Sequence, residues 1–170
     1  MENSRETIKF LLTALGLYIL WYLVYDVWIL PDGQLDKWLC QNVAFVGAQA
    51  LHLLGFNGAV NDITVFINQS PVVRVGNPCN GLILFALFTG FIIAYPGNWK
   101  NKLFFIPLGI AAIYLLNIIR VVCLALNGFY SYETLDFNHK YTFTFIVYAC
   151  IFGFWMLWVK RYAKPLSNLD

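Results

Sequence analysis

A cysteine lies in a polar, turn-forming run, residues 76–81 with the sequence GNPCNG, directly before an apolar stretch. Pro78 has a fixed φ and no amide hydrogen, so it suits the entry of a helix. The free amides and the positive dipole end at a helix start favour a thiolate over a thiol. The sequence therefore predicts a reactive Cys79 near the first turn of the following helix, with Asn77 and Asn80 as turn and capping residues.

Two other polar residues are unusual for their surroundings. Arg120 lies inside an apolar run, and His139 begins the next one. An arginine at membrane depth is costly unless it is paired, reaches the headgroups or lines a polar cavity. Asn117 precedes Arg120 by about one helical turn, which favours a polar stripe facing the protein interior over an arginine that extends to the outer headgroups. The alternative for His139 is a histidine at a helix start, with Asn138 as the cap.

Together, Cys79, His139 and Arg120 would suit nucleophilic acyl chemistry. An imidazole can take the thiol proton, the thiolate can attack a carbonyl carbon, and the imidazolium can protonate the leaving amine. A guanidinium, which stays protonated, can stabilise the oxyanion or hold a substrate carboxylate. We expect these three side chains to meet.

The other cysteines and the second histidine suit less specific roles. Cys40, Cys123 and Cys150 are expected to pack, and His52 is a reserve candidate for the base. The four cysteines form no CxxC pair and no zinc-finger spacing, so we expect no metal site and no cofactor. A disulfide between Cys40 and Cys79 stays open as an alternative, although it would consume the reactive thiol.

The composition indicates an integral membrane protein. Of the 170 residues, 60% are hydrophobic and 12% are charged, unlike the balance of soluble domains. A single domain of this length cannot hide so much apolar surface from water. The net charge of +2 is small and gives no support for nucleic acid as a partner.

Four apolar segments are expected to cross the bilayer, at about residues 10–30, 79–95, 103–126 and 140–159. The first is too long for the apolar core of a signal peptide and lacks a suitable cleavage site, so we expect it to be retained. The expected fold is an all-α integral membrane protein. It has four transmembrane helices, an outer amphipathic helix and a short β-hairpin, in a single membrane domain over residues 1–170.

The outer segment, residues 31–78, holds the two additional elements. Residues 35–54 predict an amphipathic helix that lies either in the interface plane or against the bundle. Its apolar face comprises Leu35, Leu39, Val43, Val46, Ala50 and Leu53, and its polar face includes Asp36. Residues 61–75 alternate around a turn at 68–71, which predicts the β-hairpin.

The basic residues predict the orientation. With the N-terminus inside, three or four lysines and arginines fall outside and seven fall inside, namely Arg5, Lys9, Lys100, Lys102, Lys160, Arg161 and Lys164. Arg120 then lies about 27 Å along its helix from Lys102. That is the outer level at which the spans of Cys79 and His139 begin. We therefore expect cytoplasmic termini and an outward-facing site.

The order of these residues resembles the exosortase/archaeosortase family of membrane-embedded cysteine transpeptidases. The matching pieces are the run around Cys79, the Asn-x-x-Arg motif at 117–120 and His139 at the start of the last span. They fall within roughly residues 62–162. Each piece alone is unspecific, and their order at a shared membrane depth carries the resemblance.

The resemblance implies an enzyme of the cytoplasmic (inner) membrane of a bacterium, where it cleaves C-terminal sorting signals of surface-destined proteins on the outer side. Cys79 would be the nucleophile, His139 the general acid and base, and Arg120 the stabilising cation, with three supporting residues, Asn117, Asn80 and Asn77. The implied partners are membrane-anchored substrate proteins, the lipid bilayer and a lipid or glycan amine as acceptor. Water is the alternative acceptor.

Some features depart from the family pattern, and two other functions stay open. Many members have more spans, and the residue after the cysteine is often serine where this chain has Asn80. The chain could instead be a non-enzymatic transport or assembly subunit that binds an anion through Arg120. A quinone-linked thiol oxidoreductase would need Cys40 and Cys79 as a redox pair.

Overall fold

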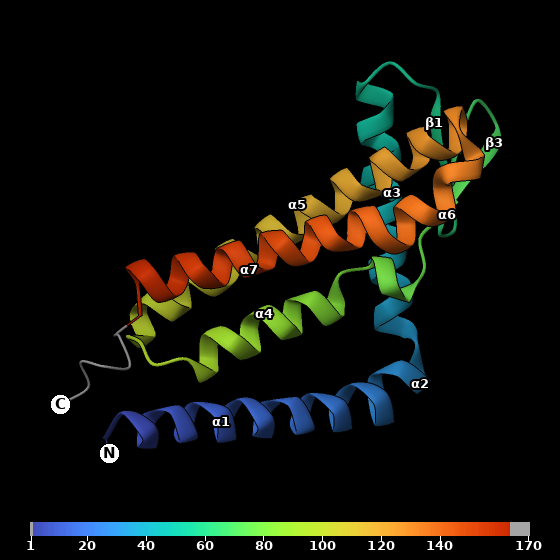
Figure 1. Ribbon diagram of the computed structural model, residues 1–170. Helices are drawn as coiled ribbons and strands as arrows, with labels where there is room; N and C mark the ends of the chain where they lie inside the picture. Colours follow the sequence, from blue (N-terminus) through green and yellow to red (C-terminus); the bar gives the residue numbers. More distant parts are fainter. Residues whose placement is uncertain (1, 164–170) are drawn as a thin grey trace. The chain divides into compact units, whose positions relative to one another are not determined.

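The computed structural model describes residues 2–163, with side chains from Arg5 on. The protein is mostly helical with one small sheet (Figure 1). It forms two compact units, each built from separate stretches of sequence. The first unit holds the chain up to Asp32, Ile83–Ala112 and the described chain from Ala149 on, and the second holds Gly33–Leu82 and Ile113–Tyr148. The predicted site falls entirely within the second unit.

Among residues 2–163, three helical stretches are long and apolar enough to cross a membrane: Arg5–Asp32, Trp99–Tyr130 and Tyr132–Arg161. The first runs through α1 (Glu2–Val24), the π-helical turn η1 (Tyr25–Ile29) and α2 (Leu30–Asp32). The second is the single helix α5 (Trp99–Tyr130). The third joins η3 (Tyr132–Thr134), α6 (Leu135–Phe137), η4 (Asn138–Thr142) and α7 (Phe143–Arg161).

The fourth predicted span, residues 79–95, is not confirmed. Its helix α4 (Leu82–Ala94) has 13 residues and is therefore about 20 Å long, less than the hydrocarbon layer of roughly 30 Å. The helix begins after Cys79 because Gly81 has a φ of 86°, a left-handed conformation that interrupts a right-handed helix.

Aromatic side chains fill the interior of the first unit. Phe88 of α4 is fully buried, and its ring centroid lies 6.0 Å from that of Phe105 and 6.4 Å from that of Phe154. Gly109 of α5 allows this approach, since a Cβ atom there would lie 2.1 Å from the Phe88 ring. By contrast, the most apolar window of the first stretch buries none of its residues, as suits a helix that is surrounded largely by lipid.

The sheet of the second unit has three strands where a two-stranded hairpin was predicted. β1 (Gly58–Asn61), β2 (Thr64–Ile67) and β3 (Ser70–Arg74) pair antiparallel in that order. The predicted turn between β2 and β3 is present, with a positive φ at Asn68 and Gln69 as in a type I′ turn. β1 was missed because Asn57-Gly58 is a turn-like pair. Gly58 instead lies against α3, where a Cβ atom would be 2.6 Å from the Ala48 carbonyl oxygen.

Helix α3 (Gln34–Leu53) forms as predicted and packs against this sheet within the second unit. The buried face includes Leu39 and Val43 as predicted, but elsewhere it differs from the predicted one: Leu53 is 87% exposed, whereas Asp36 is 1% exposed. Small residues let this face approach the neighbouring elements closely, and Leu39, Val43 and Leu51 are buried beside them. At Gly47, for example, a Cβ atom would lie 3.0 Å from Val121 Cγ1 of α5.

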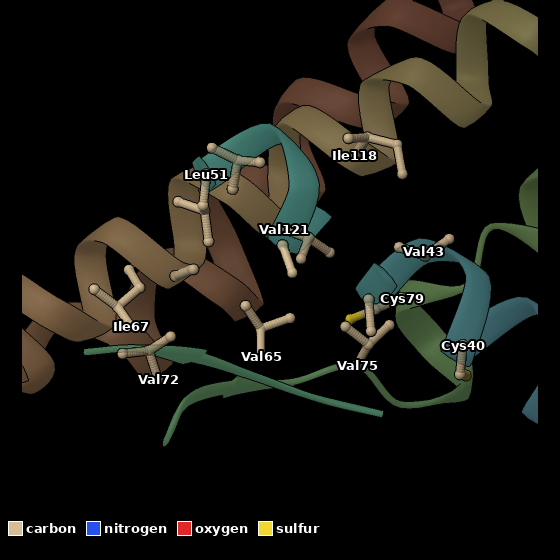
Figure 2. Packing of buried hydrophobic residues seen from close by; sticks show 14 residues of the cluster. Cys40, Val43, Leu51, Val65, Ile67, Val72, Val75, Cys79, Ile118 and Val121 are labelled. Atoms are coloured by element: carbon tan, nitrogen blue, oxygen red, sulfur yellow. The ribbon is translucent and has the colours of Figure 1, made fainter. Parts of the chain in front are cut away.

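The sheet, α3 and α5 enclose one apolar core, seen in Figure 2. Val65 and Ile67 of β2 are completely buried, as is Leu51 of α3, and Val121 of α5 is 1% exposed. Cys40 and Cys79 also belong to this cluster. The core therefore connects α3, the sheet and the C-terminal half of α5 to the turn that carries Cys79.

The segment between the last two predicted spans, residues 127–138, is mostly helical. α5 continues to Tyr130, and residues 138–142 form the π-helical turn η4. His139 therefore lies inside a helical stretch, and Asn138 is not its cap. The Asn138 side chain instead donates to Asn127 Oδ1 at 3.2 Å and accepts from Thr142 Oγ1 at 2.9 Å.

Candidate active site

Cys79 is the last residue of a single 3-10 turn, Asn77–Cys79, and Pro78 precedes it near the start of that turn. The Cys79 amide donates to the Gly76 carbonyl oxygen at 2.8 Å, and the Asn80 amide donates to the Asn77 carbonyl oxygen at 3.3 Å. Cys79 thus precedes α4, which begins at Leu82, and lies outside its first turn. Side chains from two other elements approach it.

The imidazole of His139 supplies the first of these contacts. Its Nε2 atom lies 3.0 Å from Cys79 Sγ, within reach for proton transfer. The π-helical turn η4 presents this side chain, and such turns recur at functional sites because they change the direction of side chains within a helix. The His139 carbonyl oxygen accepts from Thr144 Oγ1 at 3.2 Å. The two side chains therefore come from segments 60 positions apart.

Arg120 reaches the same place from α5. It is 7% exposed, and its Nη2 donates to the His139 carbonyl oxygen at 3.4 Å. Its Nε has no hydrogen-bond partner within residues 2–163. A buried guanidinium with donor capacity left over can hold an anionic group. The alternative of an arginine extended to the headgroups does not fit this burial.

Burial and neighbouring groups shift the pKa of Cys79 in opposite directions. Burial raises the pKa of the thiol, while the Arg120 charge and the hydrogen bond with the Gly76 backbone lower it, and the net effect is a raised pKa. The predicted preference for a thiolate at Cys79 is therefore not supported, because the pKa of the thiol is raised and not lowered. Below its raised pKa the sulfur carries its proton, so an adjacent base such as His139 is what would make it a nucleophile.

The three predicted supporting residues differ in how they connect to the site. Asn80 is fully buried; it donates from Nδ2 to the Asp36 carboxylate and accepts from the Leu82 amide at 2.9 Å. Asn77 Oδ1 lies 3.9 Å from Cys40 Sγ, a weak contact. Asn117 is 1% exposed, and within residues 2–163 its side-chain amide has no hydrogen-bond partner. It is thus a buried polar group beside Arg120 in the sequence, with no bond to Cys79 or His139.

Sequence reasoning missed Asp36, which it placed on the polar face of α3. A pattern in the sequence could have found it. Cys40, Ala44 and Ala48 form a stripe of small residues at helical spacing, typical of close packing, and Asp36 lies one turn before that stripe. The buried carboxylate extends this stripe to the turn of Cys79.

The remaining candidates lie elsewhere. His52 is exposed on α3, and no contact joins it to Cys79, so the structure gives no support to it as the base. All four cysteines are free thiols. No group of three metal-binding side chains occurs in the part of the chain that the structure describes. A cavity of about 460 Å³ borders His139, with Arg74, Tyr132 and Asp136 among its lining residues.

One of three comparisons with known proteins found a match. A family model described as transmembrane exosortase matches residues 3–159, a range that contains Cys79, Arg120 and His139. Neither the comparison with curated proteins nor the comparison with solved structures gave a match. Because the family match extends over nearly the whole chain, we conclude that the chain belongs to the transmembrane exosortase family.

Proposed function

We propose that the protein is a membrane-embedded cysteine transpeptidase. It cleaves the C-terminal sorting signals of surface-destined proteins on the outer side of the cytoplasmic membrane. The observation that carries the proposal is the 3.0 Å contact between Cys79 Sγ and His139 Nε2 beside the buried Arg120. A free thiol next to an imidazole is the arrangement for covalent acyl transfer.

The first half-reaction forms a thioester. As Cys79 Sγ attacks the carbonyl carbon of the scissile amide, its proton passes to His139 Nε2. The carbonyl oxygen becomes an oxyanion, and Arg120 would stabilise the charge that develops there. When this intermediate collapses, the C–N bond breaks, and the leaving amine takes the proton from His139. The acyl group is then bound to sulfur through a thioester.

The second half-reaction releases the acyl group to an acceptor. A lipid or glycan amine gives a proton to His139 as its nitrogen attacks the thioester carbon. The C–S bond breaks, and the Cys79 sulfur recovers the proton. One amide is thus exchanged for another without an oxidant or reductant. A scarcity of water around the buried Cys79, which is 5% exposed, would favour the amine over hydrolysis.

The topology of the proposal is an outward-facing site with cytoplasmic termini. The support is the charge pattern, because Lys160 and Arg161 end α7 at the end opposite to His139, as the positive-inside rule favours. A cysteine introduced at the exposed Glu133 would react with a charged, membrane-impermeant thiol reagent applied to intact cells. If this cysteine fails to react in intact cells and reacts only after the cells are lysed, the proposed orientation is contradicted.

The test of function is the processing of a membrane-anchored reporter that carries a C-terminal sorting signal. Wild-type protein should convert the reporter, whereas Cys79→Ala should leave it uncut in the membrane. Cys79→Ser should retain little activity, because a hydroxyl is a far weaker nucleophile than a thiol at the same base. Processing by Cys79→Ala at the wild-type rate would refute the mechanism.

A second function has one observation in its favour. Arg120 is buried with its Nε unpartnered among residues 2–163, so the chain could be a transport or assembly subunit that binds an anion. In that case Arg120→Ala would abolish function while Cys79→Ala would leave it intact. The transpeptidase proposal expects both substitutions to impair processing.

A further inference from the structure

Helix α3 contacts the Cys79 turn at two points that lie one helical turn apart. Asp36 accepts a hydrogen bond from Asn80 Nδ2, and Cys40 Sγ lies 3.9 Å from Asn77 Oδ1. Asn77 begins the 3-10 turn and Asn80 follows its end. One face of α3 therefore touches both sides of the candidate nucleophile.

Asn80 is the stronger of the two connections. Its side-chain oxygen accepts from the Leu82 amide at the start of α4, at 2.9 Å, while its side-chain nitrogen donates to Asp36. Both donor and acceptor functions of this amide are thus used, and the residue is fully buried. The Asn80 side chain therefore joins three parts of the second unit: the Cys79 turn, the start of α4 and helix α3.

The other partner is a carboxylate in an unusual place. Asp36 is 1% exposed on a helix face that otherwise packs against the apolar core. A carboxylate without hydrogen bonds would be costly there, and a hydrogen bond between a carboxylate and an amide N–H is stronger than one between neutral groups. The charge-assisted bond to Asn80 offsets part of the cost of burying Asp36.

We propose that Asp36 is a positioning residue for the transfer reaction, which holds Asn80 and thereby sets the Cys79 sulfur at bonding distance from His139. This inference rests on the proposed function for its biological meaning. Asp36 acts through its hydrogen bond with Asn80, so its role is to position the reacting groups and not to react. Its effect comes from geometry, since proton transfer over a 3.0 Å contact is lost when the two atoms move apart by about an ångström.

The first experiment exchanges the two partners. Asn80→Asp alone would place two carboxylates face to face, and we expect at least about a tenfold loss of reporter processing and of the alkylation rate of Cys79 by iodoacetamide. Asp36→Asn alone keeps an acceptor and should cost less than about threefold. The double variant should return to within about threefold of wild type, because the exchange restores one carboxylate facing one amide. The carboxylate introduced at position 80 would accept from the Leu82 amide and from the side-chain amide introduced at position 36.

The second experiment asks whether Asp36 acts through the Cys79–His139 pair. In otherwise wild-type protein, His139→Ala should slow the alkylation of Cys79 about tenfold at neutral pH. In the Asp36→Ala background the same change should slow it less than about twofold, because the pair is already separated. Asp62→Asn is the matched control: it changes a carboxylate that α3 contacts through an exposed 2.8 Å bond from Gln41 and should leave the tenfold effect intact.

These measurements separate the two proposals, because alkylation needs no substrate. Suppose that wild type does not process the reporter, while the double variant still restores the alkylation rate and the effects of Asp36→Ala and His139→Ala on alkylation are still non-additive. That result would reject the transpeptidase function and leave the role of Asp36 standing. The role of Asp36 would be overturned by a fully active Asn80→Asp variant, by a double variant as slow as Asn80→Asp, or by effects of Asp36→Ala and His139→Ala that simply multiply. If Asn80→Asp fails to accumulate in membranes, the second experiment still decides, since it does not use that variant.

Discussion

Two cysteines lie in the same apolar core, about equally hidden from solvent, and their surroundings differ completely. Cys40 is 1% exposed in the middle of α3, where burial and the charge of Asp36 raise the pKa of its thiol to about 11. Cys79 is 5% exposed at the end of a single turn. Burial raises the pKa of that thiol as well, but Arg120 opposes the shift and His139 Nε2 lies 3.0 Å from its sulfur.

The comparison shows that burial alone does not distinguish a structural thiol from a candidate nucleophile. The difference lies in the backbone that carries each thiol. A regular helix surrounds Cys40 with its own turns and with small packing residues, so that its weak sulfur contact is to a neutral amide. The turn around Cys79 leaves the sulfur facing a second segment, η4, which brings a base to it.

The largest effect is expected from removing that base. His139→Ala should lower reporter processing by about 10²- to 10³-fold, the usual contribution of a general acid–base. His52→Ala is the matched control, since His52 is exposed on α3 and should leave processing unchanged. Equal losses in the two variants would show that His139 has no special role at Cys79.

The next effect concerns Arg120. Arg120→Ala should lower processing by about 10²-fold, the usual cost of losing one charge-stabilising donor. Arg120→Lys keeps the positive charge and loses the planar fork of donors, so its rate should lie between those of wild type and Arg120→Ala. Full activity of Arg120→Ala, measured at matched protein levels, would remove Arg120 from the mechanism.

The same substitution has a consequence for pH. The Arg120 charge lowers the pKa of Cys79, so Arg120→Ala should raise that pKa further. At neutral pH the thiolate fraction falls, and the alkylation of Cys79 should slow by several-fold. The rate should recover as the pH rises through the new pKa. A pH profile unchanged from wild type would show that Arg120 exerts no field at the sulfur.

The smallest effect is expected from Cys40. Cys40→Ala should leave processing within about twofold of wild type and lower the stability of the folded protein by about 1 kcal/mol, because Cys40 acts as a small apolar residue in a packed core. Thermal unfolding in detergent and reporter processing would check the two parts. A large loss of processing would show that Cys40 is more than a packing residue and would favour Cys40 and Cys79 as a redox pair.

The sequence was sufficient for the three central residues because polar side chains within apolar helices are costly and therefore conspicuous. Counting residues along the spans also placed Cys79, Arg120 and His139 at one level, and the structure brings them together. Their catalytic roles stay a prediction. Three of the four expected spans are confirmed by length and composition.

What the sequence could not supply depends on contacts between distant segments. The stripe of small residues on α3 points to the burial of Asp36, but its partner Asn80 lies 44 positions away along the chain and cannot be read from that stripe. β1 was missed because Gly58 is needed for a close approach to α3 and looks like a turn residue in isolation. The late start of α4 depends on the backbone conformation of Gly81.

The most direct test of the central claim, that His139 activates Cys79, is the site-resolved rate of alkylation by iodoacetamide, followed by mass spectrometry at neutral pH. Cys40 of the same molecule serves as the internal reference. The account predicts that Cys79 reacts at least about tenfold faster than Cys40 and that His139→Ala removes this advantage. Equal rates at the two cysteines, or a fast Cys79 that is indifferent to His139→Ala, would contradict it.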